Sequence, residues 1–551
     1  MFLRILLVLI LVSSCFVDAG ASKYFISFSD KNNTPYSVST PSDFLSAKAI
    51  SRRITQNIPV LQNDLPVDPA YILAVQNTGA VVLNRSKWYN GIIIDCDSAT
   101  LQAVTALPFV NSSTAVNRIG RSSGKIDKFK TNSVPYNSSG SLARTQSFDY
   151  GGSFNQIHLM NGEYLHDAGF KGEGMTIAIL DAGFYSVDQL SPFDSIRAGG
   201  QILGTWDFVA NDASVYEDNS HGMSVLSCIA GNVPGQLIGT APHSDFWLLR
   251  SEDAPTENII EEYNWVSAAE FADSAGADLI SSSLGYSTFD DSTMSHTYAD
   301  MNGNTCPASI GADIAASKGI LVLVSAGNLG NSAWHYISAP SDADSVLSVG
   351  SVDSAGYKSG FSSWGPSSDG NVKPNVAAKG SQTTIANTDG SIGQGSGTSF
   401  SCPVLAGSAA CLWQAHPGKT NMEVLHAIEQ SANYFNTPGD SLGYGIPNFI
   451  VADLLLGGTI LDLSSEDNLL SVFPNPFSQD FEISFYSSTN QTIHLSLIDE
   501  IGQEVGASDV EINGGKISNI SFPSLSGVHA GIYFVRVISK SKSYLRKIVK
   551  I

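Results

Sequence analysis

Four polar side chains of this 551-residue chain occupy positions where catalytic groups are expected. Asp181 ends one apolar run, His221 opens a second, Asn328 follows a third, and Ser399 leaves a glycine-rich turn. A hydroxyl nucleophile needs a general base, a carboxylate that orients the base, and a donor directed at the developing oxyanion. The four side chains supply one of each. Their types and order therefore indicate acyl transfer with a serine nucleophile.

Ser399 belongs to the stretch GQGSGTSFSCP, residues 393–403, which runs into an apolar segment ending near Trp413. Its glycines let the backbone take unusual conformations and let a substrate chain come close. Thr398 or Ser399 suits a helix start, and Pro403 is tolerated in a first turn. An anion formed beside Ser399 would face the unpaired N–H groups of that helix. An ordinary capped core helix explains the same residues, so the rest of the chain must decide.

The other three residues also have ordinary structural interpretations. Asp181 suits a turn at a strand end, and Asn328 suits a turn after a strand. His221 suits a helix cap or a core position. A carboxylate at the end of a buried strand costs desolvation unless it is partnered, so Asp181 should accept hydrogen bonds. Four such residues in one functional order are an improbable coincidence, which favours the catalytic interpretation.

The sequence around these groups predicts a parallel sheet covered by helices. Short, continuous apolar runs separated by helical stretches are typical of strands buried on both faces. Active groups of such folds gather at the carboxyl ends of the strands. We expect strands at 175–180, 246–250, 279–283, 320–325 and 346–349, with covering helices such as 258–275 and 306–318.

Two smaller units flank this α/β domain. Residues 22–120 alternate strand and helix patterns and predict a small α+β unit. Residues 121–149 are rich in Ser, Asn, Gly, Lys and Arg, which is typical of a solvated linker and of a site for proteolytic cutting. Residues 467–551 show alternating strands separated by turns, which predicts a small β-sandwich.

The composition describes a folded, exported protein. Hydrophobic residues make up 43% and charged residues 15%, and the net charge of -22 argues against binding to nucleic acid or acidic lipid. Residues 1–21 have the layout of a secretory signal peptide that ends at Ala19-Gly20-Ala21. A competing interpretation is lipoprotein processing that leaves Cys15 lipidated. No later stretch of the sequence is long and apolar enough for a membrane helix.

Six cysteines are too few for a disulfide-stapled scaffold, and no C-x-x-C pair suggests zinc. Cys402 and Cys411 lie along the expected buried helix and are interpreted as small core residues. The segment Asp300–Asn304 alternates oxygen ligands as a calcium loop does, but it lacks the later Gly and Glu of an EF-hand. We interpret it as a polar loop, so the sequence assigns no metal ligands.

Residues 150–455 resemble the catalytic domain of the subtilisin-like serine proteases. The order Asp, His, Ser is that of the subtilisin arrangement and differs from chymotrypsin and the α/β-hydrolases. Five motifs in the family's order carry the likeness: Ile-Ala-Ile-Leu-Asp181-Ala-Gly, His221-Gly-Met-Ser-Val, Ser283-Leu284-Gly285, Ser-Ala-Gly-Asn328 and Gly-Thr-Ser399-Phe-Ser-Cys-Pro.

The resemblance implies a role for each of these residues. Asp181 would orient His221, which would act as general base and acid, while Ser399 attacks the scissile carbonyl. Asn328 and the N–H of Ser399 would bind the oxyanion. The chemistry needs no cofactor; the family often binds structural calcium, whose ligands we do not assign. Two segments would pair with the substrate backbone and line the main specificity pocket: Ser283, Leu284 and Gly285, and Ser325, Ala326 and Gly327.

Some neighbours depart from the family pattern. Ala182 stands where Ser or Thr is usual, Met223 where Thr is usual, and Phe400-Ser401-Cys402 where Met-Ala-Thr/Ala is common. None of these changes removes a reacting group. They leave the expected activity intact but make the substrate preference harder to infer.

The flanking units resemble two known domains. Residues 22–120 are similar to the inhibitory, folding-assisting propeptide of the family, through Ser86-Lys87-Trp88-Tyr89-Asn90-Gly91 and Leu107-Pro108-Phe109-Val110. An unrelated accessory domain is the alternative. Residues 467–551 resemble the sorting domain of proteins exported by the type IX secretion system. The alternative there is a β-sandwich that binds carbohydrate or protein.

The sequence therefore predicts a secreted or surface-attached serine endopeptidase made as an inactive precursor. Its expected partners are protein or peptide substrates, its own propeptide and the type IX secretion machinery, and we expect a monomer. The alternative is a catalytically inactive, surface-anchored binding protein on the same scaffold.

Overall fold

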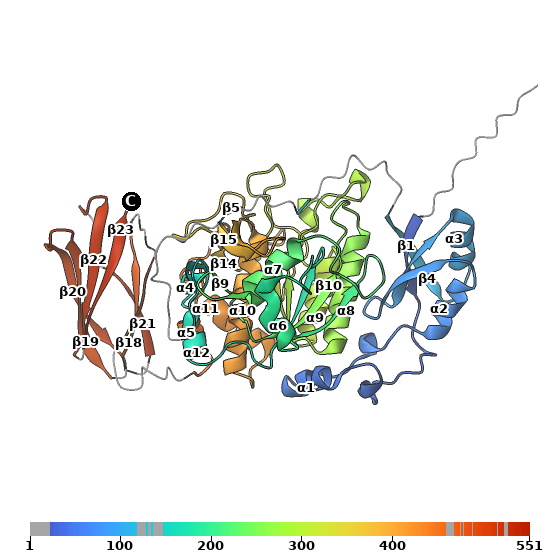
Figure 1. Ribbon diagram of the computed structural model, residues 1–551, viewed down its shortest axis with the longest axis horizontal. Helices are drawn as coiled ribbons and strands as arrows, with labels where there is room; N and C mark the ends of the chain where they lie inside the picture. Colours follow the sequence, from blue (N-terminus) through green and yellow to red (C-terminus); the bar gives the residue numbers. More distant parts are fainter. Residues whose placement is uncertain are drawn as a thin grey trace, which may run out of the picture.

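The computed structural model describes residues 22–117, 128–129, 134–135, 147–458 and most of 468–551, where 474, 476, 478, 488, 515, 523–526 and 541 are left out. The expected signal peptide, residues 1–21, and most of the linker 121–149 lie outside the described residues. Figure 1 shows an α/β domain in the middle, with a blue N-terminal unit on one side of it and a red, all-strand unit on the other.

The central domain is built on a seven-stranded, fully parallel sheet in the order β14-β13-β12-β11-β6-β10-β7. Most of its strands are buried along their whole length, as expected for strands covered on both faces. The strands are β6 (Thr176–Asp181), β7 (Ile202–Asp207), β10 (Asp245–Arg250), β11 (Leu279–Ser282), β12 (Leu321–Ser325), β13 (Leu347–Val352) and β14 (Val376–Lys379).

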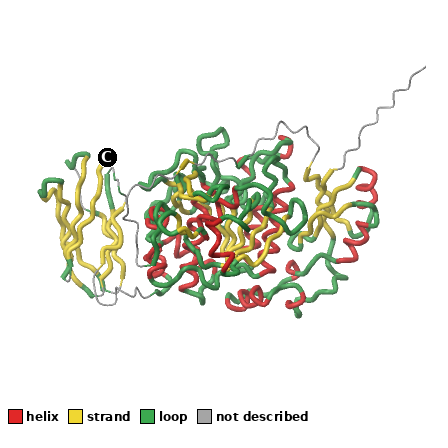
Figure 2. Tube along the Cα trace, in the orientation of Figure 1, coloured by secondary structure: helices red, strands yellow, loops and turns green. Residues whose placement is uncertain are grey.

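Helices cover both faces of this sheet (Figure 2). Because side chains alternate along a strand, Ile177 and Ile179 of β6 enter one core, while Ala178 and Leu180 enter the other. The first core contains α7 (His221–Ala230), α10 (Thr398–Ala415), α11 (Asn421–Gln430) and α12 (Phe449–Leu455); the second contains α8 (Ile260–Ala275) and α9 (Pro307–Ser317).

The α/β architecture and the five expected strands are confirmed, each to within a few residues. Two strands of the sheet, β7 and β14, were not expected from the sequence. The shorter elements of the domain are α4 (Phe154–His158), α5 (Glu163–Asp167), η3 (Ser191–Phe193), α6 (Asp194–Ala198), β8 (Asn232–Val233), β9 (Leu237–Ile238), η4 (Ser292–Met294), η5 (Tyr298–Asp300), β15 (Thr383–Ala386) and β16 (Ile392–Gly395), which pairs with β5 (Val134–Pro135).

The N-terminal unit is a four-stranded antiparallel sheet in the order β2-β3-β1-β4. Its own core joins sheet residues such as Ile26, Ile92 and Ile94 to Val75 and Val104 of two helices. Its elements are β1 (Ser22–Phe28), η1 (Pro41–Asp43), α1 (Ala47–Thr55), η2 (Gln62–Asp64), α2 (Pro69–Gln76), β2 (Val81–Ser86), β3 (Gly91–Cys96), α3 (Ser98–Thr105) and β4 (Val110–Asn117).

This unit docks on helix α8 through buried charges. Asp273 of α8 lies 2.6 Å from an Nη of Arg52, 2.9 Å from an Nη of Arg53 and 2.9 Å from Nζ of Lys87. Burial alone would raise the pKa of Asp273, but Lys87, Arg52 and Arg53 together hold it well below its ordinary value. Glu270 accepts hydrogen bonds from the N–H groups of Lys87 and Trp88 at 2.7 and 3.0 Å.

The C-terminal unit packs two antiparallel sheets, β17-β18-β21 and β20-β19-β22-β23, face to face. Its separate core includes Phe481, Ile483, Leu495, Val535 and Val537, which confirms the expected β-sandwich. The strands are β17 (Asn468–Phe473), β18 (Glu482–Ser487), β19 (Gln491–Asp499), β20 (Glu504–Ile512), β21 (Lys516–Ser521), β22 (Gly531–Ile538) and β23 (Ser543–Lys550).

Five cysteines of the described residues are free and buried, and Cys402 and Cys411 are core residues as expected. Among the described residues, every helix is too short or too polar to cross a bilayer.

Candidate active site

Asp181 and His221 are joined at the carboxyl end of β6, an inner strand of the sheet. Asp181 is the last residue of β6, and His221 is the first residue of α7. Nδ1 of His221 lies 2.8 Å from Oδ1 of Asp181, and both residues are buried. The Ala182 N–H donates to the same carboxylate oxygen at 2.7 Å. An imidazole that donates from Nδ1 to a carboxylate presents Nε2 as a proton acceptor.

The approach of α7 to β6 depends on a glycine. A Cβ at Gly222 would lie 2.5 Å from the carbonyl oxygen of Gly183 and 2.9 Å from Cβ of Asp181. Such distances leave no room for any side chain, because both neighbours belong to the backbone or lie close to it. Gly222 therefore lets the first turn of α7 bring His221 within hydrogen-bond distance of Asp181.

Ser399 is the second residue of α10, at the end of the helix where N–H groups have no intrahelical partner. The sequence placed Pro403 in a first turn, but it is the sixth residue of the helix. A proline there has no N–H for the carbonyl four residues earlier, which is that of Ser399. Ser283 Oγ donates to this carbonyl at 2.9 Å instead. The residue after β11 thus holds the backbone of Ser399.

Asn328 lies opposite the start of α10, in the loop that follows β12. Its Oδ1 accepts hydrogen bonds from the Thr398 N–H at 2.8 Å and from the Thr398 hydroxyl at 3.0 Å. Because both bonds use the carbonyl oxygen of the side chain, the Nδ2 amide is left to donate elsewhere. Asn328 and the first N–H groups of α10 can therefore act together on one anion.

Ser399 and His221 line one cavity of about 500 Å³. Among the described residues, no direct hydrogen bond joins the Ser399 hydroxyl to His221, a looseness common in substrate-free catalytic sites. The cavity brings together most of the residues expected to bind substrate: Ser283, Leu284, Gly285, Ser325, Gly327 and Asn328. Ala326 differs, because it is fully buried and does not line the cavity.

The cavity also contains a group of residues that the sequence analysis did not predict. Lys128 and Phe129 enter it from the segment that precedes the α/β domain, and Glu252 and Glu257 line it from the loop after β10. The ring of Phe129 lies over that of His221, with centroids 4.5 Å apart. The chain therefore covers its own candidate base. The three glutamates among residues 257–262 were the available signal for this group.

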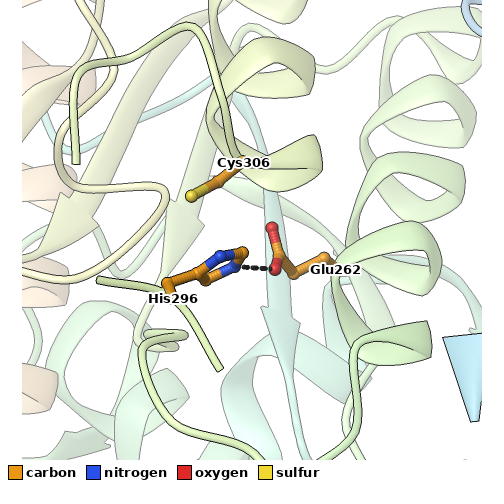
Figure 3. Close-up of side chains that lie close together, drawn as sticks. All are labelled: Glu262, His296 and Cys306. Carbon is orange, nitrogen blue, oxygen red and sulfur yellow. Dashed lines mark hydrogen bonds and ion pairs between the residues drawn. The ribbon is translucent and has the colours of Figure 1, made fainter. Parts of the chain in front are cut away.

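Two groups of three side chains are close enough to hold a metal ion among the residues described. Figure 3 shows one of them, in which Glu262 of α8 faces His296 and Cys306. Nε2 of His296 lies 2.5 Å from Oε1 of Glu262, and the Ala308 N–H donates to the other oxygen at 3.0 Å. Burial lowers the pKa of His296, but Glu262 more than offsets this and leaves it raised. An internal ion pair accounts for these contacts.

The second group is Glu252, Glu257 and Glu261, which surround the ammonium of Lys128. The loop Asp300–Asn304, whose oxygen-bearing side chains alternate as in a calcium loop, contributes no side chain to either group. Its oxygens accept local hydrogen bonds, for example from the Thr297 N–H to Asp300 Oδ2 at 2.7 Å and from the Asn304 N–H to Asn302 Oδ1 at 2.9 Å.

Comparison with known families gives three matches along the chain. The model of the subtilase family matches residues 172–446. A Bacteroidota peptidase S8 propeptide domain matches residues 23–131, and a secretion system C-terminal sorting domain matches residues 471–551.

Individual relatives are similar to about half of the chain. Subtilisin of Bacillus pumilus is 31% identical over 304 residues, which cover 54% of this chain and 96% of the relative. Subtilisin E of Bacillus subtilis is 30% identical over the same length, with 69% of the relative covered. Alkaline serine exoprotease A of Vibrio alginolyticus is 28% identical over 272 residues, which are 49% of this chain and 44% of that protein.

Proposed function

Because the chain belongs to the subtilase family and is a subtilisin-like serine endopeptidase, we propose that Asp181, His221 and Ser399 form its catalytic triad. One observation carries this assignment: the buried Asp181–His221 hydrogen bond points the imidazole into the cavity that Ser399 lines. The three residues come from the end of β6 and the starts of α7 and α10, where the fold concentrates polar groups.

The reaction follows from these positions. His221 takes the hydroxyl proton of Ser399 as its Oγ attacks the scissile carbonyl carbon, and Asp181 stabilises the resulting imidazolium. When the C–N bond breaks, His221 gives the proton to the leaving amine and an acyl-enzyme remains. A water molecule, deprotonated by His221, then hydrolyses the ester and restores Ser399.

The oxyanion of each tetrahedral intermediate would be bound by Asn328 and the N–H of Ser399. The two hydrogen bonds from Thr398 fix the side-chain amide of Asn328 before substrate binds. A donor fixed in advance needs no reorganisation during the reaction, which is the main source of its effect. Substrate backbone would lie between the segments Ser283–Gly285 and Ser325–Gly327, with Ala326 supporting the second from behind.

The protein is made as a precursor in this proposal. Residues 1–21 direct export, residues 22–120 form the inhibitory propeptide, a cut falls within 121–149, and residues 150–455 form the peptidase. The propeptide match and the ring of Phe129 over His221 both support a self-blocked precursor. The C-terminal sorting domain directs the protein to secretion and attachment at the outer surface. Calcium would serve stability only, and the chemistry uses none.

Replacement of the nucleophile tests the proposal. Ser399→Ala should abolish peptide hydrolysis and leave the precursor uncut, because alanine has no hydroxyl that could attack the scissile carbonyl. Ser401→Ala is the matched control, since its hydroxyl donates to the Thr398 carbonyl inside the same helix. Hydrolysis at a near-normal rate by the Ser399→Ala protein would disprove the assignment.

The alternative, an inactive surface-anchored binding protein, predicts a different result with a serine-directed fluorophosphonate. The processed wild-type protein should be labelled once, at Ser399, and His221→Ala should suppress labelling because the serine loses its base. Absence of label on correctly processed protein would favour the binding function.

A further inference from the structure

Three carboxylates surround one ammonium group beside the catalytic cavity. The Nζ of Lys128 forms ion pairs with Glu252, with Glu257 at 2.7 Å and with Glu261 at 3.1 Å. It also donates to the carbonyl of Thr256 at 2.7 Å. We call this group of acceptors, Glu252, Thr256, Glu257 and Glu261, the acidic pocket.

The acidic pocket is a built site. Glu252 and Glu261 are about 1% exposed, and Glu252 accepts a hydrogen bond from the Tyr286 hydroxyl at 2.9 Å. The Asn258 N–H donates to Glu261 at 3.1 Å. Neighbouring groups thus fix two of the three carboxylates independently of Lys128. Carboxylates gathered in this way repel one another, so a cation is required for all of them to ionise.

The ammonium that fills the acidic pocket belongs to a segment of this same chain that enters the catalytic cavity. Lys128 is followed directly by Phe129, whose ring lies over the imidazole of His221. The Lys128 N–H approaches the Ala254 carbonyl at 3.5 Å, along the loop after β10. Both residues fall inside the segment that matches the propeptide domain, residues 23–131. When the maturation cut within 121–149 falls after Phe129, the acidic pocket loses its cation and opens on the cavity that Glu252 and Glu257 line.

We propose that the acidic pocket of the processed enzyme is a specificity subsite that binds a basic side chain of the peptide substrate. The substrate position it reads is adjacent to the one whose side chain lies over His221, as Lys128 is adjacent to Phe129. This inference rests on the proposed peptidase function and adds the class of substrate: chains that carry lysine or arginine next to an apolar residue in the cleft.

Lysine suits the pocket for a physical reason. An ammonium is a compact charge with three donors, and the pocket supplies four oxygen acceptors around one point. A norleucine side chain has nearly the same length but no charge, so it would leave three carboxylates uncompensated. A glutamate would add a fourth negative charge.

The test offers the processed enzyme a set of quenched decapeptides. All peptides share one constant sequence. In each peptide one test position carries lysine, norleucine or glutamate, and the next residue on its C-terminal side is phenylalanine. The test position is moved along the peptide one residue at a time. We expect one position at which kcat/KM for lysine exceeds that for norleucine by about tenfold or more, since a buried charge pair is lost. Glutamate should be the poorest residue there.

Substitutions of Glu257, the partly exposed carboxylate of the acidic pocket, show whether the lysine preference arises in this pocket. Glu257→Gln should reduce the lysine-to-norleucine ratio, and Glu257→Lys should bring it to about one or below, because the pocket then holds its own cation. Glu173→Gln is the matched control: Glu173 lies on the far side of the domain, beside His243 and Gln414, and the ratio should not change.

The outcomes separate the two proposals. Cleavage of the norleucine peptides without a lysine preference at any position would overturn the acidic subsite alone. A preference that Glu257→Lys leaves intact would do the same. Calcium binding by the pocket, seen as a loss of stability in EDTA with no lysine preference, would also overturn it. Failure to cleave any peptide would overturn the peptidase function and the subsite together.

Discussion

At the scale of single residues, the site depends on contacts that hold a few atoms in place. Thr398 fixes the oxygen of the Asn328 side chain, and Ser283 fixes the carbonyl that Pro403 leaves without a helical partner. Oδ2 of Asp181 is buried and has no hydrogen-bond partner among the described residues. Ala182 stands where the family usually has a hydroxyl side chain, and its methyl group cannot donate a hydrogen bond to this oxygen.

Asn328→Ala tests the oxyanion role. We expect kcat to fall by about 10²–10³-fold with little change in KM, because the donor acts on the transition state and not on the bound substrate. The readout is steady-state hydrolysis of one peptide, with the circular dichroism of the variant as a check on folding. Asn331→Ala, in the same loop, is the control. A large rise in KM at unchanged kcat would show that Asn328 binds ground-state substrate instead.

The order of the motifs was enough to predict which residues meet at the carboxyl ends of the strands. Asp181, His221, Asn328 and Ser399 were found because parallel strands bring their ends to one edge of a sheet. Lys128 and Glu252 could not be found in this way. Lys128 is 124 residues before Glu252, it lies in a segment without apolar periodicity, and only the fold brings the two together.

At the scale of elements, helix α8 does more than cover the sheet. Near its first turn Glu261 holds Lys128, and near its last turn Glu270 and Asp273 hold the N-terminal unit. The charges that dock this unit are almost fully buried on both sides. A buried pair is worth little over a well-packed apolar contact, but breaking it leaves a charge without compensation.

Asp273→Asn should therefore weaken the docking of the N-terminal unit. In an uncut Ser399→Ala background, we expect the free energy of unfolding of that unit to fall by about 3–5 kcal/mol, because Arg52, Arg53 and Lys87 lose their shared partner. Urea unfolding followed by tryptophan fluorescence measures this. Asp194→Asn, which breaks an exposed pair with Arg197, should cost no more than about 1 kcal/mol.

The same carboxylate predicts a pH dependence. Because Asp273 has a lowered pKa in the docked state, its contribution is complete above the ordinary aspartate value and is lost as pH falls below about 4. The stability difference between wild type and Asp273→Asn, both in the Ser399→Ala background, should shrink over that range. A difference that stays constant from pH 7 to pH 2 would contradict the assignment.

The missed strands show where element prediction stops. The edge strand β7 is half exposed and contains Gly204, Thr205 and Trp206, so it lacks the apolar run by which the inner strands were found. The other edge strand, β14, has only four residues and follows Pro374 closely. β14 is buried along its whole length, so its short length and not its exposure hid it. The inner strands were predictable because they are buried on both faces and carry a longer apolar run.

At the scale of the molecule, the described residues form three folded units in one chain. The N-terminal unit is tied to the α/β domain by many buried contacts, whereas the sandwich keeps a core of its own. The family resemblance of all three parts is confirmed by the matches to the chain. Their processing points could not be located from the sequence, because the linker has no periodic pattern from which a cut could be inferred.

Removal of residues 459–551 tests this division. We expect the truncated protein to keep kcat/KM within about twofold, since a domain with a separate core contributes little to a distant site. It should no longer reach the outer surface, because the sorting domain is gone. Peptide hydrolysis by purified protein and fractionation of expressing cells measure the two effects. Normal surface delivery of the truncated protein would contradict the role of the sandwich.

Helix α8 contacts both Lys128 and the N-terminal unit. These two sets of contacts limit how the substrate preference of this enzyme can change by mutation. A substitution near its first turn that alters the acidic pocket also alters the fit of Lys128, and a shift of the helix is felt by Asp273 at the other end. A new substrate preference would therefore have to arise together with a matching change in the propeptide. Mutational paths that alter one partner alone would yield precursors that fold poorly or escape inhibition too early.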